Sequence, residues 1–187
     1  MTISVTLDAN VWNYLFNSKI CLVDELPPEF FSLYQTREVE IEIEEIPNFG
    51  KDSSDKQALK EYIGRSIQAS NVITSAIFGF AEASATGGPV IYAGFGQGTF
   101  ESEQERAWRE REETKRFMNA KSRRPTGLAK NEADVSVAVA SLSSVVITAD
   151  KKAGPISDAA KNGGRVLYLD DVIASGLSLS EFITKNV

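Results

Sequence analysis

Histidine is absent from this 187-residue chain, and cysteine occurs once, as Cys21. The lack of histidine removes His-based general acid–base catalysis, Ser–His and Cys–His nucleophile pairs, and almost every kind of zinc site. A single cysteine cannot form an internal disulfide, which favours a reducing compartment. Enzymatic chemistry would therefore rest on carboxylates, lysine, tyrosine or a metal. A site built only from carboxylates suits a hard cation such as Mg²⁺ or Mn²⁺.

Long apolar runs are missing as well. No apolar stretch approaches the roughly 18 residues that a membrane span needs, and MTISVTLDAN has neither the basic nor the apolar segment of a signal peptide. We therefore expect a cytoplasmic protein that does not associate with membranes. The composition, 42% hydrophobic and 25% charged, predicts one ordered domain over residues 1–187. The net charge of −6 argues against non-specific binding to duplex nucleic acid but leaves room for a local basic patch.

The hydrophobic periodicity alternates between that of strands and that of helices, which predicts a parallel α/β sheet with helices on both faces. The predicted strands cover 3–7, 31–36, 145–150 and 165–170, and the predicted helices cover 10–17, 53–69, 101–119, 131–143 and 171–185, with a short helix beginning at Pro28. Residues 71–100 are rich in glycine, alanine and aromatic residues, and we expect an irregular or hairpin-like segment there.

The segment REVEIEIEEIP at 37–47 fits two structures. Its alternation of glutamate with β-branched residues is that of a strand, in which all the glutamates would share one solvent face. Glutamate favours helices, however, and Pro47 provides a stop, so we favour a helix. In that helix Glu42 lies on the apolar stripe with Val39 and Ile46, while the other glutamates of the run, Glu38, Glu40, Glu44 and Glu45, face outward.

Four acidic residues are expected to converge at one edge of this sheet. Asp8 and Asp150 each follow an apolar strand, and the carboxyl ends of parallel strands meet at one edge. Asp134 falls in the first turn of a helix, and Glu42 lies on a core-facing stripe. Each also has a structural interpretation, as a helix cap, a turn residue or a solvated charge. Together, four carboxylates around one cleft would repel each other unless a cation lay between them, which is the reason to expect a metal.

Four short motifs in this order, VTLDANVWNYL, EIEEIP, NEADVSVAVAS and VVITADKKAG, resemble the successive motifs of the PIN-domain family. The resemblance covers about the first 50 and the last 60 residues. It implies an α/β/α sandwich of PIN type, here with a helical or irregular insertion at about 70–125. It also implies a catalytic, metal-binding set of Asp8, Glu42, Asp134 and Asp150, with Asn10 and Thr148 orienting the acids.

The same resemblance implies a function. The expected activity is that of a Mg²⁺- or Mn²⁺-dependent endoribonuclease, as in the toxins of toxin–antitoxin pairs, with RNA as substrate, a cognate antitoxin as partner, and a homodimeric assembly. A non-catalytic RNA- or protein-binding regulatory protein on the same fold is the alternative. A phosphatase of the haloacid dehalogenase type ranks below both, because its first strand should end in DxDx[TV] and Asn10 stands at the second aspartate.

Basic residues gather in one part of this acidic chain. No aspartate or glutamate occurs from Thr114 to Asn131, and the segment runs into the helix that carries Asp134. Part of this charge complements the end of a helix. We expect the substrate phosphates to be bound by the side chains closest to the proposed site, which are Lys121, Arg123, Arg124 and Lys130.

Overall fold

The computed structural model describes residues 2–49, 56–77, 98–118 and 127–187, and the account below concerns these residues. Their strands form one sheet in the order β4-β3-β2-β1-β5-β6, in which every pairing is parallel. The strands are β1 (Ile3–Leu7), β2 (Phe31–Thr36), β3 (Ile73–Ile77), β4 (Gly98–Thr99), β5 (Val145–Thr148) and β6 (Val166–Tyr168). The predicted parallel α/β fold is confirmed.

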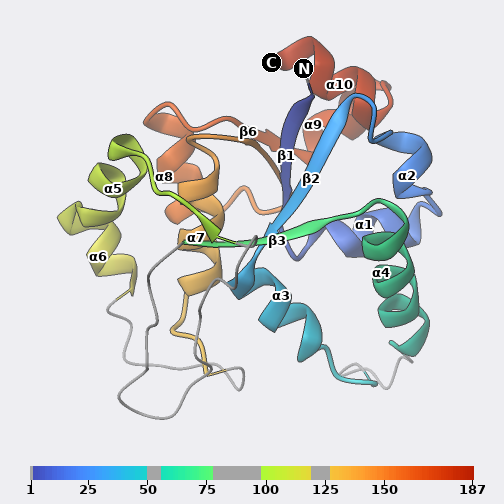
Figure 1. The fold of residues 1–187 in the computed structure, drawn as a ribbon, viewed down its shortest axis with the longest axis horizontal. Coiled ribbons are helices and arrows are strands. Elements are labelled where there is room, and N and C mark those ends of the chain that lie inside the picture. The colour runs from blue at the N-terminus through green and yellow to red at the C-terminus, as the bar shows by residue number, and fades with distance from the viewer. Residues whose placement is uncertain (1, 50–55, 78–97, 119–126) are drawn as a thin grey trace.

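Helices pack on both faces of this sheet (Figure 1). One face is covered by α1 (Val11–Asn17), α2 (Leu22–Glu25), α4 (Gln57–Ala69), α9 (Leu169–Ser175) and α10 (Leu179–Asn186). The other is covered by α3 (Arg37–Glu44), α5 (Glu103–Glu110), α7 (Glu132–Ala140) and α8 (Pro155–Lys161), with α6 (Glu112–Met118) beside them. The alternation of side chains along β1 separates the two faces, because Val5 and Leu7 enter the first core and Thr6 points to the second face.

The segment at 37–47 is a helix, as predicted, and α3 begins directly at the end of β2. Thr36 caps it by accepting a hydrogen bond from the Val39 N–H, and the helix ends at Glu44, three residues before Pro47. Val39 is buried, so the apolar stripe faces the protein. This arrangement places the acidic helix at the carboxyl edge of the sheet.

Several predicted elements differ from the observed ones. The segment 71–100 contributes β3 and β4, which pair in parallel, so the described part of it is no hairpin. The predicted helix over 101–119 is two helices, because Arg111 has an extended backbone with ψ 143°. The predicted closing helix over 171–185 is also divided, since Gly176 adopts φ 68° after α9. The residues after Pro28 form a turn rather than a helix, with the N–H groups of Phe30 and Phe31 both donating to the Pro27 carbonyl.

No helix among the described ranges combines the length and the apolar character that crossing a membrane requires. The Ser cap predicted for the helix over 53–69 falls in 50–55, outside the described residues, and α4 is seen from Gln57. Of the segment at about 70–125 that the resemblance leaves unmatched, residues 70–77 and 98–118 are described.

Candidate functional site at the carboxyl edge of the sheet

Asp8 is a buried carboxylate directly after β1, with 4% of its surface exposed. Its Oδ1 accepts a hydrogen bond from the Ala9 N–H at 2.7 Å. Its Oδ2 accepts two more at 2.6 Å, one from Thr148 Oγ1 and one from Asn10 Nδ2. A carboxylate offers about four acceptor positions, so these three bonds leave one open, on Oδ1. Asp8 is therefore held in one orientation and can still accept one ligand.

Asn10 and Thr148 join the ends of two neighbouring strands around Asp8. Asn10 Oδ1 accepts the Ala149 N–H at 2.7 Å, and Asn10 Nδ2 lies 3.2 Å from Thr148 Oγ1. Thr148 Oγ1 also accepts the Asp150 N–H at 2.9 Å. This network connects Asp8 after β1 to Asp150 after β5, as expected if both residues orient the acids.

The electrostatics of Asp8 involve a second acid. Burial raises the pKa of the Asp8 carboxyl, the hydrogen bonds from Thr148, Ala9 and Asn10 offset part of that rise, and the negative charge of Asp134 adds to it. Two carboxylates that oppose each other's ionisation must lie close together. The structure thus brings Asp134, in the first turn of α7, within electrostatic range of Asp8.

Asp134 also lines a pocket with Asp150. The pocket has a volume of about 580 Å³, and its wall includes Lys130, Asn131 and the residues that begin α8. Asp150 is oriented by its own turn, because its Oδ1 accepts the Lys152 N–H at 2.9 Å. Asp8 does not line this pocket, but Thr148 connects it to Asp150, because Thr148 donates to Asp8 and accepts the Asp150 N–H. Three of the four predicted acids therefore meet at one edge.

Glu42 lies on α3, which begins at the end of β2. It is half-buried midway along α3, does not line the pocket of Asp134 and Asp150, and is not among the charges that shift the pKa of Asp8. Its neighbour Glu40 is engaged locally, accepting a hydrogen bond from Thr74 Oγ1 at 2.9 Å and pairing with Arg37. The role predicted for Glu42 stays a prediction.

Sequence reasoning missed Glu38. It was expected to face outward, yet it is only partly exposed, and burial raises the pKa of its carboxyl. The nearby charge of Glu132 raises that pKa further, while Ser136 and Arg109 lower it. Glu38 thus faces α7 rather than solvent. The alternation of small polar residues with apolar ones in β1 and β2 was the available signal that this side of the sheet is polar.

The carboxylate oxygens of Asp8 and Asp134 suit a hard divalent cation. The number of carboxylates that can bind such an ion here is limited. Within the described ranges, no three acidic, cysteine or histidine side chains are grouped closely enough to enclose a metal ion. Mg²⁺, however, often keeps several waters and binds through one or two carboxylates and the substrate's phosphates. The facing pair of Asp8 and Asp134, with an acceptor position still open on Asp8, fits that mode of binding.

Of the predicted phosphate-binding side chains, Lys121, Arg123 and Arg124 lie outside the described residues, and Lys130 is placed on the wall of the pocket that holds Asp134 and Asp150. A cation at this position would attract a phosphate toward the acids.

No family model, no curated protein and no solved structure matches this chain.

Proposed function

We propose that the chain is a Mg²⁺- or Mn²⁺-dependent ribonuclease of the PIN type, which hydrolyses phosphodiester bonds of single-stranded or structured RNA. The observation that carries the proposal is the buried Asp8 carboxylate, clamped by Thr148 and Asn10 and facing Asp134 at the carboxyl edge of a parallel sheet. Ligand sites in parallel α/β folds form at this edge. Asp150 and Lys130 on the adjoining pocket wall supply a further acid and a phosphate-attracting charge.

In this proposal Asp8 and Asp134 are the residues that would hold the cation, while Asp150 lines the adjoining pocket with Asp134. When bound, such an ion lowers the pKa of a coordinated water and offsets the charge that develops on the phosphate. Thr148 and Asn10 orient Asp8 and favour its ionised form against the effect of burial, because both donate to Oδ2. Lys130, together with Lys121, Arg123 and Arg124, would bind the phosphates on either side of the reacting one.

The proposal is tested by incubating purified protein with single-stranded RNA and Mn²⁺ or Mg²⁺, with Asp134→Asn as the comparison. Cleavage that needs both the metal and Asp134 supports it. The absence of cleavage by a folded wild-type protein would favour the alternative, a non-catalytic regulatory protein on this fold. A cognate antitoxin, a homodimeric state and a cytoplasmic location belong to the same proposal and are tested separately, by co-purification, by sedimentation and by fractionation.

A further inference from the structure

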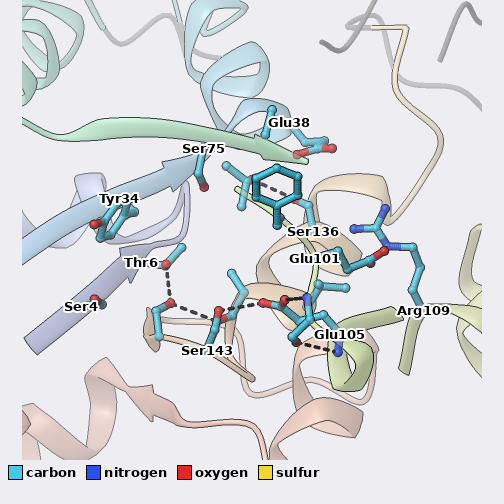
Figure 2. Close-up of a pocket in the computed structure, with 17 residues that line it drawn as sticks. Ser4, Thr6, Tyr34, Glu38, Ser75, Glu101, Glu105, Arg109, Ser136 and Ser143 are labelled. Atoms are coloured by element: carbon cyan, nitrogen blue, oxygen red, sulfur yellow. Dashed lines mark hydrogen bonds and ion pairs between the residues drawn. The ribbon is translucent and has the colours of Figure 1, made fainter. Parts of the chain in front are cut away.

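A polar cavity of about 370 Å³ lies between the sheet and helices α5 and α7 (Figure 2), and it shares no lining residue with the pocket of Asp134 and Asp150. Residues of β1, β2, β3, α3, α5 and α7 contribute to its wall, and nine of the 17 lining residues carry a hydroxyl group. Cavities that bind small organic ligands begin at about 300 Å³. The volume therefore suits a ligand of about one ring system, and the lining indicates a ligand that forms hydrogen bonds.

The hydroxyl groups of this wall have mostly donated their protons already. Ser144 donates to the Ala140 carbonyl at 3.0 Å, which makes Thr6 the donor in the 2.6 Å bond between Thr6 and Ser144. In the same way, the proton of Ser136 is directed to the Ala133 carbonyl or to the Glu38 carboxylate, so Thr36 donates to Ser136. These oxygens can therefore still accept hydrogen bonds but have no proton left to donate. A ligand that matches the wall must therefore supply N–H or O–H donors.

Three glutamates and one arginine give the cavity an excess of negative charge. Glu105 is satisfied, because it accepts from the Ser102 N–H at 2.7 Å and from Ser143 Oγ at 2.7 Å. Glu101 and Arg109 point toward each other in Figure 2, with Oε1 and Nε 3.0 Å apart. The excess charge would repel a phosphate or a carboxylate. The ligand is therefore neutral or cationic at the part that enters the cavity.

Glu38 is the acceptor best suited to such a ligand. Its carboxyl lies on the cavity wall beside Ser136, and burial raises its pKa, so it would gain from new donors. An aromatic surface stands at the same cavity, because Phe100 lines it with 85% of its surface exposed. An exposed aromatic ring next to a recessed carboxylate allows a flat ligand to stack on one and donate to the other.

We propose that this cavity binds a nucleobase, guanine most tightly, with its N–H edge donating to Glu38 and its ring stacked on Phe100. Guanine presents a ring N–H and an amino group side by side, and a carboxylate can accept both. The assignment to a base of the RNA substrate rests on the proposed function, since Thr6 lines the cavity and Asp8, two residues further on, points to the same face about 7 Å away. The phosphates of such a strand stay outside the acidic cavity, toward Lys130.

The test measures binding without cleavage. Fluorescently labelled UUGUU, UUAUU and UUUUU strands are titrated with the full-length protein in EDTA, and free guanosine is then used as a competitor. We expect UUGUU to bind at least tenfold more tightly than UUUUU, the value of one well-made hydrogen bond to a charged group. Glu38→Gln should bring the two strands within about twofold of each other. Glu44→Gln, a change of the same charge on the exposed side of α3, should keep the preference.

A second variant protects the test against a folding defect in Glu38→Gln. Ser75→Leu fills part of the cavity from β3 and leaves Glu38 in place, so it should also remove the guanine preference. Competition by free guanosine would show that the base alone is recognised, and its absence would show that the strand is required. No preference for UUGUU in the wild type, or a preference that survives both Glu38→Gln and Ser75→Leu, would overturn the proposal. Metal-dependent cleavage of RNA without a preference for guanine would support the proposed nuclease activity and contradict only the binding of guanine in this cavity.

Discussion

Asp8 is held in position by two residues that the resemblance to the PIN-domain motifs had indicated, Thr148 and Asn10. Thr148 is fully buried and donates to Asp8 Oδ2 while accepting the Asp150 N–H. Asn10 holds the same carboxylate oxygen and bridges to the backbone after β5. At the scale of single residues, the proposed site is therefore a buried hydrogen-bond network whose members depend on each other.

Thr148→Val tests this network. The valine has nearly the same shape but cannot donate to Asp8 or accept from the Asp150 N–H, so buried polar groups lose their partner. We expect a loss of about 1–3 kcal/mol in the free energy of unfolding, measured by urea denaturation. Thr184→Val, which removes a hydroxyl from the exposed face of α10, is the control and should change stability by less than about 0.5 kcal/mol. Equal effects in the two variants would contradict the network.

Glu38 predicts a dependence of stability on pH. Its pKa in the folded protein is raised above the ordinary value of 4.5. Below that value the carboxyl is protonated in both the folded and the unfolded states. As pH rises through the raised pKa of the folded protein, the buried acid must ionise, and the unfolding free energy falls. Glu38→Gln cannot ionise, so its advantage over the wild type should grow from about pH 4.5 upward. Thermal denaturation of both proteins across this range measures it, and a constant difference would refute it.

At the scale of elements, α7 is packed on both of its flanks. Its first turn carries Asp134 toward Asp8, while Ser136, two residues further, faces the polar cavity. Residues two apart point to different sides of a helix, so one short helix can serve both places. The chain returns to the sheet after α8 close to the end of α7, where Arg165 N donates to the Ser141 carbonyl at 2.8 Å.

Gly164 is required for that close approach. A Cβ on it would press against Ser141 Oγ, which is fully buried, and would lie 3.0 Å from the Ala159 carbonyl oxygen. We expect Gly164→Ala to lower the free energy of unfolding by about 1–3 kcal/mol. Gly64→Ala in α4 has nothing within 4 Å of the new methyl group and should raise it by about 0.5–1 kcal/mol. Denaturant unfolding of the two variants measures both effects, and a stabilised Gly164→Ala protein would show that the contact can relax.

The sequence predicted the elements that carry strong local signals and failed where tertiary contacts decide. β1, β2 and α3 were expected near their observed bounds, because alternation, the helix preference of glutamate and the stop at Pro47 are local features. The pairing of β3 with β2 was not, since residues 73–77 contain no pattern that distinguishes a sheet strand from a hairpin arm. The break between α5 and α6 at Arg111 was also missed, because residues 101–119 contain no local pattern that marks it.

The candidate site shows the same division. Asp8, Asp134 and Asp150 were expected together because the strand ends of a parallel sheet share an edge, which is a rule of topology. The facing of Glu38 depends on which flank of α3 meets α7, and helical periodicity within α3 cannot reveal that. The polar cavity requires six elements to come together, so no single segment contains its signal.

At the scale of the whole molecule, we expect a divalent cation that binds near Asp8 and Asp134 to stabilise the fold. Asp8 and Asp134 oppose each other's ionisation, and an ion that binds only the folded state relieves this repulsion. At ten times its dissociation constant the ion should add about 1.4 kcal/mol, or about 3–6 °C in Tm for a chain of this size. Thermal denaturation with and without Mg²⁺ or Mn²⁺ measures the gain, which Asp134→Asn should lose and Asp158→Asn, on α8, should keep. A gain that persists in Asp134→Asn would place the ion elsewhere.

The central claim is that Asp8 and Asp134 together support metal-dependent hydrolysis of RNA. The most direct measurement is the cleavage rate of an end-labelled single-stranded RNA by wild type, Asp8→Asn and Asp134→Asn, with Mn²⁺, with Mg²⁺ and with EDTA. Asp24→Asn, an exposed substitution on α2 purified in the same way, controls for contaminating nuclease. The account predicts cleavage by the wild type and Asp24→Asn that EDTA abolishes, and a rate at least about a hundredfold lower in the other two variants. Equal cleavage by all four proteins, or none by a folded wild type with either metal, would contradict it.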